Sequence, residues 1–398
     1  MKCLSELALN IQPSSTLAID ALYKQMKADG VDVIGFGAGE PDFETPEAIK
    51  RAGIAAIEQN ETKYTPSNGT VELRQAICRR LWQDFQVGYG TEEVSVSNGA
   101  KTCVYASLRV LINPGDEVIL PTPYWVSYIE LIRLAGGVPV LLETGESEAF
   151  KITPQKLESR ITPRTKCIIL NNPSNPTGMM YDEAELRGLG EVCVRHDLYI
   201  IADEIYAQLV YDGRKFTSVA SISPEIKERT LLVNGVSKTY AMTGWRIGYV
   251  AAPKAISKVI SNYLGHCTGS PCAISQKAAL EALTGDQSPV ERMRAQFEQR
   301  RNYMVQRINQ MPGVSCLMPN GAFYVMMNLE NLMGRRFFQT KIESADDFGR
   351  VLLQHGNVAV VPGTGFGAPN FVRWSYAASM EQIKAGLDRL EQCLAAGR

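Results

Sequence analysis

The chain has 398 residues, enough for more than one domain, and its 45% hydrophobic and 21% charged residues are typical of a soluble globular protein. A formal net charge of −1 leaves no basic surplus to neutralise phosphates, which argues against a nucleic-acid partner. No signal-peptide core and no run of roughly 18 apolar residues is present, so we expect no membrane partner. The nine scattered cysteines and three dispersed histidines predict a reducing, cytoplasmic location and no metal site.

From about residue 92 to residue 252, short apolar runs alternate with helical patterns. Strands are expected at Val94–Ser97, Glu117–Leu120, Val138–Leu142, Cys167–Leu170, Tyr199–Ala202, Leu231–Val233 and Ile247–Ala251. Helices are expected between them, for example at Lys101–Leu111, Trp125–Ala135 and Glu183–His196. This alternation predicts an α/β domain with a mostly parallel sheet that helices cover on both faces.

The C-terminal part has a different pattern. A long, highly charged amphipathic helix is expected at Pro289–Met311, and a final helix at Met380–Leu394. Between them, Val314–Met327 and Val358–Val361 are expected to contribute strands. The sequence therefore predicts a second, smaller α+β unit. Because no low-complexity linker separates the two units, we expect them to pack closely.

The segment SKTYAMTGWR, residues 237–246, follows the predicted strand Leu231–Val233. Lys238 lies just past the strand end, and lysine amines form Schiff bases with carbonyl substrates and with pyridoxal 5′-phosphate (PLP). Ser237 and Arg246 would supply a hydroxyl and a forked cation for a phosphate group. The alternative interpretation is an exposed loop lysine beside a structural arginine.

Two other predicted strands also end in polar side chains. Tyr199–Ala202 runs into Asp203, at the strand end where open α/β sheets place ligand-binding groups. Asp203 could keep a pyridine nitrogen protonated, and Tyr206 could bind the phenolic oxygen of the same ring. Asn175 follows the strand at Cys167–Leu170, in a loop that two prolines and a glycine make rigid.

The strings NNPSNPTG, ADEIY and SKTYAMTGWRIGY, in this order and spacing, resemble those of class I PLP-dependent aminotransferases. The resemblance runs from about Pro13 to about Tyr376. The opening strings QPSSTLAI, GAGEPDF and TKYTPSNG are most similar to the bacterial aspartate aminotransferase branch, which includes aspartate/prephenate aminotransferases. This resemblance implies the fold-type I architecture. It also implies a large PLP-binding domain at residues 44–285, and a small domain with an N-terminal arm at residues 1–43 and 286–398.

The resemblance implies further cofactor contacts. Gly99, Ala100 and Lys101 fall at the phosphate-binding turn, where a helix N-terminus favours an anion. Trp125 falls at the aromatic that stacks on the cofactor ring, although a core tryptophan is the commoner role. Tyr64 matches a tyrosine that reaches the phosphate of the neighbouring subunit, which implies a homodimer with active sites shared across the interface.

Substrate contacts are implied in the same way. Gly39 matches a position where the backbone approaches the substrate carboxylate, and Asn175 and Trp125 face the substrate. Arg373 would bind the α-carboxylate in a two-pronged fork; an internal salt bridge is the alternative. Animal and enteric aspartate enzymes bind the second carboxylate with another arginine, for which we find no match. The bacterial branch instead places Thr16 and Lys101 there, as do relatives that accept prephenate.

Together these residues predict a PLP-dependent aminotransferase with Lys238, Asp203 and Tyr206 as catalytic residues. We expect it to transfer the amino group of L-aspartate to 2-oxoglutarate, and the reverse, by a ping-pong mechanism through pyridoxamine phosphate. Prephenate is a further possible acceptor. Alternatives are an aminotransferase of aromatic donors or alanine, and a PLP-dependent C–S lyase, because the cofactor carries the chemistry in each case. A non-catalytic regulator is disfavoured, since the aminotransferase pattern starts near the N-terminus.

Overall fold

A computed structural model describes residues 4–13 and 15–397, without the side chains of residues 15–17 and 20, and a seven-stranded sheet is its largest feature. The strand order is β2-β8-β7-β6-β5-β3-β4. The strands are β2 (Val94–Ser97), β3 (Glu117–Pro121), β4 (Val138–Leu142), β5 (Thr165–Asn171), β6 (Tyr199–Asp203), β7 (Thr230–Gly235) and β8 (Gly248–Ala251). All run in one direction except β8, which pairs antiparallel with both neighbours. The predicted mostly parallel sheet is confirmed.

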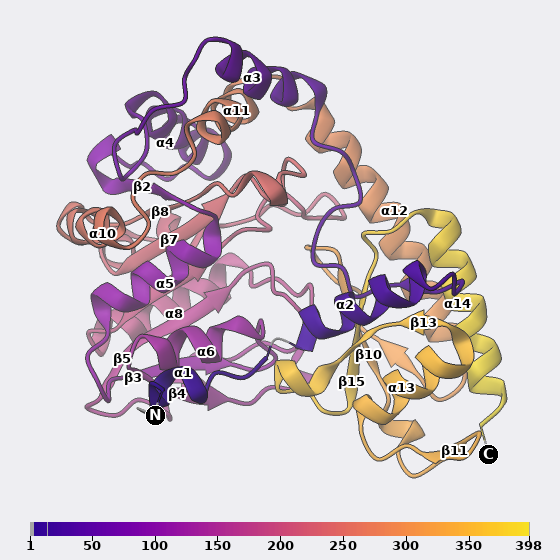
Figure 1. The fold of residues 1–398 in the computed structure, drawn as a ribbon. Coiled ribbons are helices and arrows are strands. Elements are labelled where there is room, and N and C mark those ends of the chain that lie inside the picture. The colour runs from indigo at the N-terminus through magenta and orange to yellow at the C-terminus, as the bar shows by residue number, and fades with distance from the viewer. Residues whose placement is uncertain (1–3, 14, 398) are drawn as a thin grey trace.

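Helices cover both faces of this sheet (Figure 1). They are α5 (Ala100–Leu111), α6 (Ser127–Leu134), α7 (Pro154–Glu158), α8 (Glu183–Arg195), α9 (Pro224–Lys227) and α10 (Lys254–Cys267). In β5, Ile169 packs under α5, α6 and α10, whereas its neighbour Ile168 packs under α7 and α8. Successive strand residues face opposite sides of a sheet, so a strand that is covered twice is apolar throughout. No helix in the described ranges is long and apolar enough to cross a membrane.

A third group of helices packs beside the β2 and β8 edge of the sheet. It consists of α3 (Glu47–Glu58), α4 (Val71–Phe85) and α11 (Ala273–Thr284). A Cβ atom at Gly53 of α3 would lie 2.7 Å from the ring of Trp245, so only glycine permits this approach. Trp245 precedes Arg246, and its packing therefore fixes the loop that carries several of the predicted site residues.

The C-terminal part forms a smaller antiparallel sheet of order β14-β15-β10-β9. Its strands are β9 (Ser315–Cys316), β10 (Tyr324–Asn328), β14 (Val361–Pro362) and β15 (Phe371–Ser375), and its helices are α12 (Ser288–Gln310), α13 (Ala345–Gly356) and α14 (Met380–Ala395). A hairpin joins β11 (Arg336–Phe337) to β12 (Thr340–Lys341). The strand region predicted at Val314–Met327 is thus two strands separated by a turn, in which Ala322 has a φ of +58°.

The N-terminal segment also contacts this smaller unit. It contains α1 (Glu6–Leu9), α2 (Ser15–Ala28) and β1 (Ile34–Gly35), and β1 pairs in parallel with β13 (Val358–Ala359). Helix α2 lies beside the C-terminal elements in Figure 1 and contacts β14. These contacts agree with an N-terminal segment that joins the small domain. The domain boundaries near residues 43 and 285 stay a prediction.

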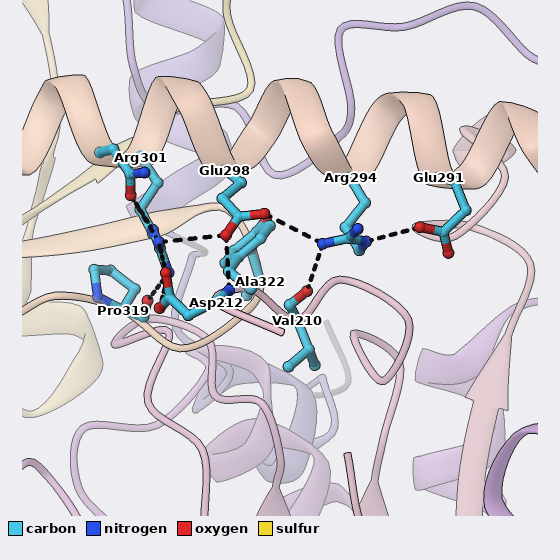
Figure 2. A network of polar contacts seen from close by, with 10 residues as sticks. Val210, Asp212, Glu291, Arg294, Glu298, Arg301, Pro319 and Ala322 are labelled. Atoms are coloured by element: carbon cyan, nitrogen blue, oxygen red, sulfur yellow. Dashed lines mark hydrogen bonds and ion pairs between the residues drawn. The ribbon is translucent and has the colours of Figure 1, made fainter. Parts of the chain in front are cut away.

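Helix α12 is tied to the rest of the protein by the polar network in Figure 2. Arg301 is 1% exposed and donates to both carboxylate oxygens of Asp212, at 2.9 and 2.6 Å, and to the Pro319 carbonyl at 2.8 Å. Glu298 accepts a hydrogen bond of 2.7 Å from the Asp212 backbone and pairs with Arg294 at 3.2 Å. A forked pair of this kind, with its guanidinium buried, is strongly directional. It holds the segment after β6, which carries the predicted site residue Tyr206, against α12.

Candidate active site

A cavity of about 350 Å³ opens where β5, β6 and β7 end. The carboxyl ends of parallel strands meet at one edge of a sheet, so side chains that follow separate strands come together there. Of the residues predicted from the sequence, the cavity is lined by Gly39, Ala100, Lys101, Trp125, Asn175, Asp203, Tyr206, Ser237, Lys238, Arg246 and Arg373. Tyr64 and Gly99 do not line it in this chain, and the side chain of Thr16 lies outside the described part of the structure.

One wall of the cavity is suited to an anion. Gly99 caps α5 with a φ of +91°, and the first N–H groups of a helix have no partner within the helix. A Cβ atom at Gly99 would lie 2.3 Å from Nη2 of Arg246, and one at Gly248 would lie 2.3 Å from the Ala100 nitrogen. Both positions therefore need glycine. Arg246 is held by the Thr243 carbonyl at 2.8 Å, and the buried Ser237 lines the same cavity.

The carboxylate of Asp203 lies at the end of β6 and is almost fully buried. Tyr128 donates a 2.7 Å hydrogen bond to Oδ2, and the Ile205 N–H donates to Oδ1 at 3.3 Å. Burial raises the pKa of Asp203 to about 6, while the hydrogen bonds from Tyr128 and Ile205 and the charge of Lys238 oppose this shift. A cation placed beside this carboxyl would favour its charged form.

Lys238 reaches the same cavity from the loop after β7. Its Nζ donates a hydrogen bond to the Gly39 carbonyl, which joins this loop to the N-terminal segment. Burial of the amine lowers the pKa of Lys238 to about 8, although the Glu40 carboxylate opposes this shift. The side chain as a whole is only half-buried, because its stem faces the open cavity. An amine with this pKa is available as a base near neutral pH far more often than an ordinary lysine.

Arg373 projects from β15 and is 2% exposed. Its Nη1 donates to the Asn175 side chain at 3.0 Å and its Nη2 to the Gly37 carbonyl at 2.8 Å. Its Nε is buried without a hydrogen-bond partner among the described residues. No carboxylate in the described part of the chain lies within ion-pair distance of this guanidinium, so the structure does not support the internal salt bridge considered from the sequence. A buried guanidinium with a free donor is suited to a carboxylate ligand.

The sequence comparisons agree with this geometry. The family pattern Aminotransferase class I and II matches residues 31–390. The chain belongs to this family. It is 48% identical to the aspartate aminotransferase of Geobacillus stearothermophilus over 99% of both chains, and 44% identical to the aspartate/prephenate aminotransferase of Cereibacter sphaeroides over 98% of both. The solved structure of the aspartate aminotransferase from Rhizobium meliloti superposes with a TM-score of 0.96, covers 100% of both chains and is 40% identical. The predicted family and α/β fold are confirmed.

Trp125 and Lys101 form another wall of the cavity. The Lys101 ammonium lies 5.0 Å from the Trp125 ring, within range of a cation–π interaction. Partial desolvation and the nearby Arg246 cation both lower the pKa of Lys101. Much of the Lys101 side chain is nevertheless exposed to solvent, so its interactions are screened more than those of Arg373.

Each of the three residues Tyr64, Thr16 and Gly99 has its own explanation. Tyr64 is 98% exposed, and its predicted partner belongs to a second subunit. Thr16 lies in α2, and its side chain lies outside the described part of the structure. The third, Gly99, contributes its backbone behind the anion-binding wall, as described above.

Sequence reasoning missed two tyrosines that line the cavity. Tyr128 lies in the first turn of α6, three residues after Trp125, which precedes that helix, and the two rings meet edge to face. Its closeness to Trp125 is the signal in the sequence that could have indicated it. Tyr324 begins β10, in an apolar run that is also typical of a core strand. Both hydroxyl groups contact predicted site residues, Asp203 and Tyr206 respectively.

Proposed function

We propose that this chain is a PLP-dependent aminotransferase that moves the amino group of L-aspartate to 2-oxoglutarate, and that prephenate is a further acceptor. The observation that supports this most strongly is the convergence of Lys238, Asp203 and Arg373 on one cavity. The names of the relatives support aspartate and prephenate as substrates. Both compounds are dicarboxylates, so one pair of cationic binding positions could serve either.

The residues of the cavity fit PLP. Its phosphate would be held by the N-terminus of α5, Ser237 and Arg246. Gly99 and Gly248 have no side chains that would displace the Arg246 guanidinium or the α5 backbone, so these donors are available to the phosphate. Asp203 would pair with the ring nitrogen and Tyr206 with the phenolic oxygen. Lys238 would provide the covalent attachment. When bound, PLP supplies an electron sink for the charge that develops at the substrate Cα.

The protein side chains would then control the proton and the substrate. Lys238, with its pKa lowered to about 8, would take the Cα proton at Nζ as a general base. Asp203 would stay ionised beside the ring cation, because its hydrogen bond from Tyr128 stabilises the carboxylate. Trp125 would exclude water from one face of the ring.

Substrate recognition would depend on two cations. Arg373 would bind the α-carboxylate of every substrate, with Asn175 holding the guanidinium in place. Lys101 and Thr16 would favour substrates with a second carboxylate. Tyr64, exposed in this chain, would reach the phosphate bound by the partner in a homodimer with shared sites.

A panel of substrates tests this proposal. The purified protein with PLP should convert L-aspartate with 2-oxoglutarate, oxaloacetate with L-glutamate, and L-aspartate with prephenate. Much higher efficiency with aromatic donors or alanine would reject aspartate as the preferred donor. Release of pyruvate from a cysteine conjugate, without transfer to an acceptor, would indicate a C–S lyase instead.

A further inference from the structure

The hydroxyl group of Tyr324 contacts Tyr206, the residue that would bind the phenolic oxygen of PLP. Tyr324 is the first residue of β10 and is fully buried, and its hydroxyl lies 3.0 Å from that of Tyr206. The two rings meet edge to face, with centroids 5.9 Å apart. Both residues line the cavity. The hydroxyl of Tyr324 also faces the backbone of Gly39, where a Cβ atom would lie 3.5 Å away.

The other side of Tyr324 contacts Arg373. The guanidinium carbon lies 4.4 Å from the centroid of the Tyr324 ring, within range of a cation–π interaction. The register of the small sheet explains this contact, because Tyr324 pairs with Ser375 and Met326 pairs with Arg373. Tyr324 and Arg373 are therefore diagonal neighbours on one face of the sheet. The charges of Arg373 on β15 and Glu40 in the N-terminal segment act on the Tyr324 phenol in opposite directions, the first lowering and the second raising its pKa.

The hydrogen bond between the two tyrosines restricts where their protons point. Burial raises the pKa of both phenols, so each carries one proton and can donate only once. Either hydroxyl could be the donor of the bond between them. If Tyr206 donates to Tyr324, its proton is not available to a ligand. If Tyr324 donates, the Tyr206 proton is free to point into the cavity.

We propose that Tyr324 is a positioning residue, which donates to the Tyr206 oxygen and thereby directs the Tyr206 proton toward the phenolic oxygen of bound PLP. This inference rests on the proposed function, since it concerns the same cofactor. A donor that itself accepts a hydrogen bond becomes a stronger donor, because the bonds in a chain polarise one another. Tyr324 thus strengthens the hydrogen bond from Tyr206 to the cofactor. Its ring also contacts Arg373, which would bind the substrate carboxylate.

The test compares Tyr324→Phe, Tyr206→Phe and the double variant with the wild-type protein. The readouts are the dissociation constant for PLP, from quenching of tryptophan fluorescence in the apoprotein, and the pH midpoint of the visible absorbance of the bound cofactor. Tyr324→Phe should weaken PLP binding about threefold to tenfold, the range for one lost hydrogen bond. The pH midpoint should move upward, because a donor to the phenolic oxygen stabilises its deprotonated form.

The double variant separates this role from a general effect on packing. If Tyr324 acts through Tyr206, the double variant should match Tyr206→Phe in both readouts. Tyr376→Phe is the matched control, since it removes a buried hydroxyl that donates to the Ala322 carbonyl at 3.3 Å and lies outside the cavity lining. The control should alter thermal stability without moving the pH midpoint.

Two results would overturn the inference: an unchanged pH midpoint in Tyr324→Phe, or effects of the two single variants that add in full. A failure of the proposed function is distinguishable from these. If the protein does not bind PLP, the wild type does not acquire the visible absorbance of the cofactor, and if PLP serves another reaction, the substrate panel reports it while the pH midpoints of the variants still test the role of Tyr324.

Discussion

Replacement of Arg373 by lysine tests how the cavity recognises its substrates. The guanidinium is 2% exposed, donates to Asn175 and Gly37, and keeps one buried donor without a partner. A lysine at this position keeps the charge but cannot donate the two parallel hydrogen bonds that a planar guanidinium gives to a carboxylate. Truncating one partner of a buried cation–carboxylate pair costs about 2–5 kcal/mol. Because lysine keeps the charge, we expect the lower end of this range, and ~2 kcal/mol at ~1.36 kcal/mol per tenfold predicts a fall in kcat/KM of ~30-fold.

The assay is steady-state kinetics at saturating PLP with L-aspartate and L-phenylalanine as donors. Both donors carry the α-carboxylate, so both should lose efficiency by a similar factor. Arg300→Lys is the matched control, because Arg300 is also buried and binds Asp42 at 2.7 Å but does not line the cavity. A wild-type kcat/KM in Arg373→Lys, or a loss confined to L-aspartate, would refute the assigned role.

Three further predictions address substrate choice, stability and assembly. Lys101→Ala should reduce kcat/KM for L-aspartate by about tenfold and spare L-phenylalanine, a modest effect because Lys101 is solvent-exposed; equal losses at saturating PLP would reject its role in selectivity. Glu204 is fully buried, and burial raises its pKa from 4.5 to about 8, so only the unfolded chain ionises as the pH rises between these values. Its contribution to the free energy of unfolding should fall over this range by at most ~5 kcal/mol, at ~1.36 kcal/mol per pKa unit. Urea unfolding of Glu204→Gln should therefore depend less on pH than that of the wild type, and parallel pH profiles would contradict this. Finally, the inactive variants Tyr64→Ala and Lys238→Ala should regain activity when reassembled into mixed dimers; verified heterodimers without activity would show that each subunit builds its own site.

Much of the site could be predicted because its residues follow strands. Asp203 is the last residue of β6 and Lys238 follows shortly after β7, and strand ends in a parallel sheet meet at one edge whatever the loops between them. The cap at Gly99 was predictable for a similar reason, since glycine before a helix leaves the backbone donors open.

The contacts that sequence reasoning missed are made between distant segments. Tyr128 is 75 residues from Asp203, and Tyr324 is 118 residues from Tyr206. In sequence, both tyrosines have the spacing of ordinary core residues. The partner of Tyr128 depends on how α6 packs on the large sheet, and that of Tyr324 on how the small sheet packs against the segment after β6. Glu204 is a further case. Its hydrogen-bond donors, Ser218 and Val219, lie in a later segment that folds back against the end of β6, and the sequence does not show this contact.

A single half-reaction tests the proposed function most directly. The protein is loaded with PLP, freed of excess cofactor, and mixed with L-aspartate in the absence of any 2-oxo acid acceptor. One equivalent of oxaloacetate per bound PLP should form and production should then stop, until 2-oxoglutarate is added and L-glutamate appears. Lys238→Ala should form none. Continuous release of a 2-oxo acid with ammonia before any acceptor is added, or no oxaloacetate from the wild-type protein, would contradict the proposal.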